Sequence, residues 1–313
     1  EHLFDQALTL FKETVFQRSS LNRDVFEEEK RNLIELYEGM KDRKRSYAQL
    51  RFLSHFFKRS SEGIPLSGKL RDIKKVMFED LVSYYETILE SNAVEIVING
   101  HLNDAMKQKV QALLPPFPPA NYPIQFVAKR KKKVTQIVEK METKQGIIWV
   151  GYRLPIFAND DLYDAALLVD TILGEYPESR LFSIIREEKG LCYDVSSGYD
   201  SYKGVLLINA GVSLDLRHDA LRAILDVVSD LKLNGITEHE LRSSKAYLTH
   251  LLKSSLDSQS QQTQRTLTKR ILGDTREMDA RLASLNAVTI DDIMSVLARL
   301  ELDTTYILED IHD

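Results

Sequence analysis

The sequence predicts an α+β fold built from two related units, of which the first is incomplete. Three observations lead to this prediction. Residues 1–113 carry mainly helical apolar spacing, whereas residues 144–313 alternate between strand-like and helix-like segments. In addition, residues 76–98 resemble residues 288–310 without a gap, as expected of an internal repeat.

The first part of the chain is expected to be mostly helical. Near the N-terminus, apolar residues recur every three or four positions and so share one helix face: they are Leu3, Ala7, Leu10, Phe11 and Val15. Asp24 is the expected N-cap of a second helix. Residues 45–58 and 79–89 predict two more helices, and residues 94–98 predict a strand.

A segment rich in proline separates the two parts. Residues 114–123 hold five of the eight prolines, and a basic run follows at residues 129–133. Proline fixes φ and lacks a backbone donor, so it is unsuited to a helix or an inner strand. We therefore predict a linker over residues 114–143, between a first unit at 1–113 and a second at 144–313.

The second part alternates between the two kinds of segment. Apolar and β-branched runs predict strands at 147–152, 193–199, 204–212 and 304–308. Helical spacing predicts helices at 162–173, 180–188, 219–231, 238–254, 258–272 and 291–300.

The repeat also predicts that the first unit is truncated. Residues 76–98 and 288–310 are separated by a constant offset of 212, and both read as helix, turn and strand. With the second unit starting near Gln145, the same offset places the start of the first unit well before Glu1. The chain is thus expected to be an N-terminally truncated fragment.

Composition excludes several classes of protein. The chain of 313 residues has a formal net charge of −5, which argues against nucleic-acid binding. No apolar stretch approaches the ~20 residues of a membrane span, and no secretory signal is visible, so a cytoplasmic location is expected. The single cysteine, Cys192, rules out an internal disulfide and is expected to be a buried, inert thiol.

The residues alone predict no catalytic centre. No two of the seven histidines lie three or four positions apart, the spacing that points two imidazoles at one zinc ion from a helix. No glycine-rich phosphate loop is present either.

Residues 173–182 and 185–195 carry the most information. Their Leu-Gly, Ser-Arg-Leu-Phe and Arg-x₃-Gly-Leu-x-Tyr elements resemble the C-terminal unit of M16 (insulinase/pitrilysin-type) metallopeptidases. The resemblance covers nearly the whole chain and implies two homologous α/β units, each a sheet backed by helices, that close on a peptide. It identifies Arg186 and Tyr193 as candidate catalytic residues. A guanidinium and a phenol are both donors that could stabilise the oxyanion of amide hydrolysis.

Two departures from the family concern its zinc ion. The family motif His-x-x-Glu-His, whose histidines bind zinc and whose glutamate activates water, is absent from the chain. The family's third ligand lies seven residues after the glutamate of a Glu-Lys pair, and counting from Glu29 leads to Leu36, which cannot bind a metal. We therefore expect no metal site and no cofactor in this chain, with zinc supplied by a partner subunit or by a missing N-terminal segment.

Three functions fit the resemblance. The first is the non-zinc subunit of a heterodimeric bacterial M16 peptidase, which binds an unfolded peptide and supplies Arg186 and Tyr193 to a zinc-bearing partner. The second is a fragment of an active zinc peptidase, and the third is a structural, non-proteolytic homologue. Leu36 favours the first over the second, and the Arg186/Tyr193 pair favours both over the third. A homodimer is an alternative to the heterodimer.

Overall fold

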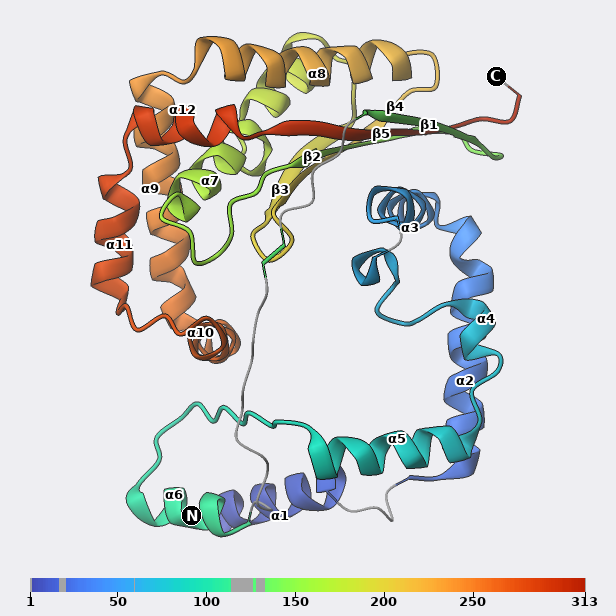
Figure 1. Cartoon of the computed structure of the whole chain (residues 1–313), viewed down its shortest axis with the longest axis vertical. Helices are drawn as coiled ribbons and strands as arrows, with labels where there is room; N and C mark the ends of the chain where they lie inside the picture. The colour runs from blue at the N-terminus through green and yellow to red at the C-terminus, as the bar shows by residue number, and fades with distance from the viewer. Residues whose placement is uncertain (1, 17–20, 59, 114–125, 128–132, 313) are drawn as a thin grey trace.

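The described part of the chain contains one mixed five-stranded sheet with helices on both faces (Figure 1). The computed structural model describes residues 2–16, 21–58, 60–113, 126–127 and 133–312. The strands are β1 (Thr135–Lys140), β2 (Gly146–Arg153), β3 (Asp194–Asp200), β4 (Val205–Val212) and β5 (Glu301–Glu309). Their spatial order is β1-β5-β2-β4-β3; β1 runs parallel to β5 and all other neighbours are antiparallel. The α+β class and the four predicted strands of the second part are confirmed.

Strand β2 lies in the middle of the sheet and is buried on both faces. Ile148 and Val150 belong to the larger hydrophobic core, while Ile147 and Trp149 belong to a smaller core on the opposite face. This division follows from the two-residue period of a strand. A strand buried on both faces has apolar residues at nearly every position. Strand β2 could therefore be predicted from the sequence alone.

One face of the sheet carries the larger core and most of the helices of the second part (Figure 1). Helices α8, α9 and α12 bury one apolar face each, and α7 is buried over most of its length. Capping boxes start α9, from Thr237, and α12, from Thr289. The helices of this part are α7 (Tyr163–Asp170), α8 (Arg217–Asn234), α9 (Glu238–Ser254), α10 (Gln259–Leu272), α11 (Met278–Ala287) and α12 (Ile290–Ala298), with π-helical turns η4 (Thr171–Glu175) and η5 (Leu181–Glu188).

A helix from the first part of the chain, α3 (Lys44–Phe56), packs on the other face of the sheet (Figure 1). Its residues Ala48, Phe52 and Phe56 are buried, and Phe52 stacks on Trp149 with ring centroids 5.4 Å apart. Gly151 of β2 permits this approach, because a Cβ there would overlap the rings of Phe52 and Phe56. Through this contact, the first part of the chain is attached to one face of the sheet.

The other helices of the first part lie away from the sheet (Figure 1). They are α1 (His2–Phe16), α2 (Arg23–Glu38), α4 (Leu70–Ile73), α5 (Phe78–Ser91) and α6 (Asp104–Leu113). The predicted N-cap of α2 was wrong: Asn22 caps it, with its Oδ1 accepting from the amide of Asp24, which lies in the first turn. Neither α2 nor α5 has a fully buried residue, so their apolar faces are only partly covered.

Two further segments differ from expectation. Residues 93–99 form no strand in the described chain, because no other described strand lies beside them to complete the hydrogen bonds. Residues 135–140, inside the segment expected to be a linker, form the edge strand β1. Most of the rest of that segment, 114–125 and 128–132, lies outside the described residues. No helix in the described ranges has the length and apolarity to cross a membrane.

Candidate functional site

Arg186 lies in the last turn of η5 with its side chain partly open to solvent. Its guanidinium carbon is 4.7 Å from the centroid of the Phe182 ring, and its Nε is 3.7 Å from a carboxylate oxygen of Glu187. Both contacts come from neighbours on the same helical segment. They leave the guanidinium at the surface, with donors that can meet another molecule.

Tyr193 stands immediately before β3 and is 61% exposed. Its amide donates to the carbonyl of Gly211 at 2.9 Å, which joins its backbone to β4. Its phenol oxygen is 2.9 Å from the Ser213 hydroxyl. The backbone is thus fixed by the sheet while most of the ring and the hydroxyl face solvent.

A tight turn connects these two residues. Gly190 adopts a positive φ of 61°, which favours glycine, and the Leu191 amide donates to the Ile185 carbonyl at 2.9 Å. Cys192 is buried within this turn. Burial raises the pKa of its thiol to about 11, the Asp194 carboxylate adds to the rise, and the charge of Arg186 opposes it. The predicted inert thiol is therefore buried and protonated at neutral pH, and it lies within the electrostatic reach of Arg186.

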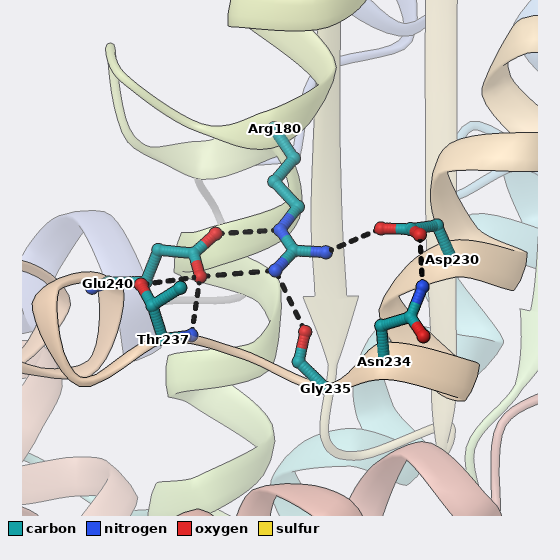
Figure 2. Close-up of polar contacts among 6 residues, drawn as sticks. All are labelled: Arg180, Asp230, Asn234, Gly235, Thr237 and Glu240. Carbon is teal, nitrogen blue, oxygen red and sulfur yellow. Dashed lines mark hydrogen bonds and ion pairs between the residues drawn. The ribbon is translucent and has the colours of Figure 1, made fainter.

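Arg180, one residue before η5, anchors that segment (Figure 2). Its guanidinium binds both carboxylate oxygens of Glu240 and one of Asp230, and donates to the Gly235 carbonyl at 2.8 Å. Glu240 also accepts from Thr237 at the start of α9. The arginine of the Ser-Arg-Leu-Phe element thus ties η5 to the α8–α9 connection, which makes it a structural residue.

Asp170 anchors β3, on the other side of the turn. Its carboxylate accepts from the Ser197 hydroxyl at 2.5 Å and from the Tyr199 amide at 2.7 Å. Burial raises its pKa to about 6, with a smaller contribution from the charge of Glu175, whereas these two hydrogen bonds oppose the rise. Asp170 was not among the predicted site residues, although an acid inside the apolar run of α7 was a visible signal.

We expect the Asp170→Asn variant to lose part of the pH dependence of stability. The raised pKa means that the folded protein binds a proton between about pH 4 and pH 6 that the unfolded chain does not bind. Protonation of Asp170 therefore raises the unfolding free energy as pH falls from 6 towards 4, by up to about 3 kcal/mol in total for two pKa units. Urea unfolding at pH 7.5 and pH 5 should show about 1.4 kcal/mol of this rise in the parent chain and not in the variant.

Asp226→Asn, on the exposed side of α8, is the matched control and should follow the parent chain. Three other carboxylates have lowered pKa values and therefore make the fold less stable as pH falls: Glu139, Glu240 and Glu309. The quantity to compare is thus the difference in unfolding free energy between variant and parent at each pH. An equal pH dependence in Asp170→Asn and the parent would contradict the expectation.

Glu29 and Leu36 lie two turns apart on α2 and line the same groove, of about 730 Å³, between α2, α4 and α5. Most of its other lining residues are apolar, including Val25, Leu33 and Leu81. Leu36 occupies the position at which the family resemblance implied a zinc-binding glutamate, and an alkyl side chain cannot ligate a metal. Nowhere in the described ranges do three or more His, Cys, Asp or Glu side chains group as a metal site would require. The residues present in this groove do not fit zinc.

Comparisons with known proteins agree with the architecture. The chain is 23% identical over 317 aligned residues to a Bacillus subtilis protein described as "probable inactive metalloprotease YmfF", covering 98% of this chain and 74% of that protein. Among solved structures, a conserved protein from Enterococcus faecalis V583 superposes with a TM-score of 0.86 at 24% identity, over 100% of this chain and 76% of that one. A "peptidase M16 inactive domain" from Pseudomonas fluorescens gives 0.80 at 18% identity, over 98% and 74%.

The family model described as "Peptidase M16 inactive domain" matches residues 75–248. This range includes Leu173-Gly174, Arg180, Arg186 and Tyr193. It extends over more than half of the chain, which therefore belongs to the M16 peptidase family through its inactive domain.

Proposed function

We propose that this chain is the non-zinc subunit of a two-chain M16 peptidase. In this role it binds an unfolded peptide and presents Arg186 and Tyr193 to the scissile carbonyl, while a zinc-bearing M16 partner supplies the metal. The observation that carries the proposal is the exposure of both side chains at the two ends of one rigid turn. Neither is packed in the core, so both can reach a bound peptide.

The two donors suit the charge that develops during amide hydrolysis. A guanidinium and a phenol are both protonated at neutral pH, so neither has to change state before donating to an oxyanion. Anchoring by Arg180 on one side and Asp170 on the other keeps the turn from reorganising during the reaction. We expect the substrate to be selected by its unfolded backbone rather than by a tight sequence motif.

We further propose that the helices of the first part belong to a second unit, homologous to the one that carries the sheet. Helices α1 to α5 occur in the same order as α8 to α12, and their first residues are separated by 208 to 215 positions. Helices α8, α9 and α12 bury their apolar faces in the larger hydrophobic core, whereas α2 and α5, which correspond to α9 and α12, have no buried residue. By analogy with α9 and α12, the apolar groove of α2 and α5 would be covered in the complete unit.

The proposal is tested on the purified chain, first alone and then with a zinc-bearing M16 chain from the same organism. We expect far less than one zinc per chain by elemental analysis. Fluorescein-labelled, reduced and carboxymethylated lactalbumin should bind to the chain, and be cleaved only when both proteins are present.

Two other results would each point to a different function. One tightly held zinc per chain, with cleavage by the chain alone, would identify a zinc peptidase. No binding of the labelled polypeptide and no effect on the partner's activity would leave a structural role.

A further inference from the structure

The first part of the chain reaches the candidate site through an ion pair between Arg45 and Asp194. Arg45, in the first turn of α3, faces Asp194, the first residue of β3 and the neighbour of Tyr193. The pairing is bidentate: Nη1 is 2.6 Å from Oδ2, and Nη2 contacts Oδ1. A forked arginine–carboxylate pair fixes orientation as well as distance.

The structure points to Arg45 as a positioning residue for Tyr193, acting through Asp194. We infer that the docking of α3 on the sheet sets the geometry of the turn that carries the two candidate catalytic donors. This inference rests on the function proposed above and adds Arg45 to the residues that this function requires.

The route from Arg45 to Tyr193 runs through the backbone. Successive residues of a strand point to opposite faces, so the Asp194 carboxylate meets α3 while the Tyr193 ring points away from it. Gly211 connects the two, because it lies opposite Asp194 in the ladder and its carbonyl accepts from the Tyr193 amide. Tilting the Asp194 backbone therefore moves the Tyr193 ring.

Gly211 also shows how closely the pair is packed. A Cβ at this position would overlap the Arg45 guanidinium, and it would lie 2.6 Å from the Gln145 amide nitrogen and 2.7 Å from the nearer Asp194 oxygen. All three atoms are the ends of flexible side chains, so Gly211 leaves room for the ion pair without being strictly required by it.

The contribution of this pair to overall stability is small, which makes the inference testable. Both side chains are about half exposed, and exposed ion pairs contribute little to folding. Helix α3 has other anchors: Phe52 and Phe56 are buried, and Arg51 pairs with Glu139 of β1 at 3.0 Å. Removing Arg45 should therefore leave α3 docked.

Arg51→Gln is the matched control for Arg45→Gln. Both arginines lie on α3, both are partly exposed and both pair with a carboxylate of the sheet, but Arg51 does so at the edge farthest from Tyr193. Trp149, the only tryptophan of the chain, stacks on Phe52 and reports by its fluorescence whether α3 stays docked.

In the peptidase reconstituted with its zinc-bearing partner, Arg45→Gln and Asp194→Asn should each lower kcat about 3- to 10-fold, less than the ~100-fold cost of a group misplaced by a full 1 Å. KM should stay within about twofold, and the double variant should be no worse than either single one, because the two residues act as one unit. Arg51→Gln should leave kcat unchanged. Trp149 fluorescence should be the same in all of these proteins.

A second readout does not depend on turnover. With 3-fluorotyrosine incorporated at position 193 of the full chain, the ¹⁹F resonance should shift in Arg45→Gln and not in Arg51→Gln. An unmoved resonance, or an equal loss of kcat in the two arginine variants, overturns the inference.

The failure of the proposed function is recognised separately, by Tyr193→Phe. If Tyr193→Phe lowers kcat while Arg45→Gln does not, the proposed function holds and the positioning role is wrong. If Tyr193→Phe has no effect, the proposed function fails, and the ¹⁹F resonance alone decides whether Arg45 positions the ring.

Discussion

Replacing Tyr193 by phenylalanine is expected to lower the turnover of the reconstituted peptidase by about 100- to 1000-fold, the range for losing one oxyanion donor. The substitution removes only a hydroxyl, and in the free chain this hydroxyl lies at the surface next to Ser213. Peptide binding should change little, because the oxyanion exists only in the transition state. The loss should therefore appear in kcat and not in KM.

Tyr202→Phe provides the control for this experiment. Tyr202 is also exposed, at 46%, but it lies in the connection from β3 to β4 at the opposite end of β3, so turnover should be unaffected. The unfolding free energy of both variants should stay within about 0.5 kcal/mol of the parent chain, as for other surface substitutions. Equal turnover in Tyr193→Phe and Tyr202→Phe would leave this chain as a scaffold.

Replacing Arg153 by methionine is expected to cost about 3–5 kcal/mol of unfolding free energy, as for other buried pairs broken on one side. Arg153 is 7% exposed and donates to Asp303 at 2.8 Å and to the Phe56 carbonyl at 2.7 Å. Its guanidinium also lies 3.9 Å from the Phe56 ring centroid. Methionine fills much of the space but leaves the buried Asp303 carboxylate without this cation, and the Phe56 carbonyl without this donor.

The measurement is urea unfolding, followed by Trp149 fluorescence and by circular dichroism. Because Arg153 holds the C-terminal end of α3, the fluorescence of Trp149 should change even before global unfolding. Arg222→Met is the control, since Arg222 pairs with Asp219 at the surface of α8, and exposed pairs contribute at most about 1 kcal/mol. A loss of less than about 1 kcal/mol in Arg153→Met would show that Asp303 is satisfied by its other neighbours.

The elements of the second part were predictable because each has a strong local pattern. Strands β2, β4 and β5 are rich in apolar or β-branched residues, the segment of β3 carries Val195 between two tyrosines, and α8, α9 and α12 carry one apolar face each. Two segments were predicted wrongly, because a strand depends on a neighbouring strand that the local sequence pattern does not show: β1 was missed, and residues 93–99 were predicted as a strand. Edge strand β1 alternates in burial and carries charges, so it resembled a linker. Residues 94–98 are apolar and strand-like, but a strand forms only where a second strand can pair with it.

The candidate site likewise combines features that the sequence shows with contacts that only the tertiary structure creates. The spacing of Arg186 and Tyr193 around Gly190, and the leucine at position 36, are properties of the sequence, because each depends only on residues close together in the chain. Arg45–Asp194, Asp170–Ser197 and the docking of α3 join residues 27 to 149 positions apart. No periodicity or motif marks such pairs, since their free energy arises only when the sheet brings them together. The sequence by itself thus determined which donors stand on the turn, and the tertiary structure decided which side chains hold that turn in place.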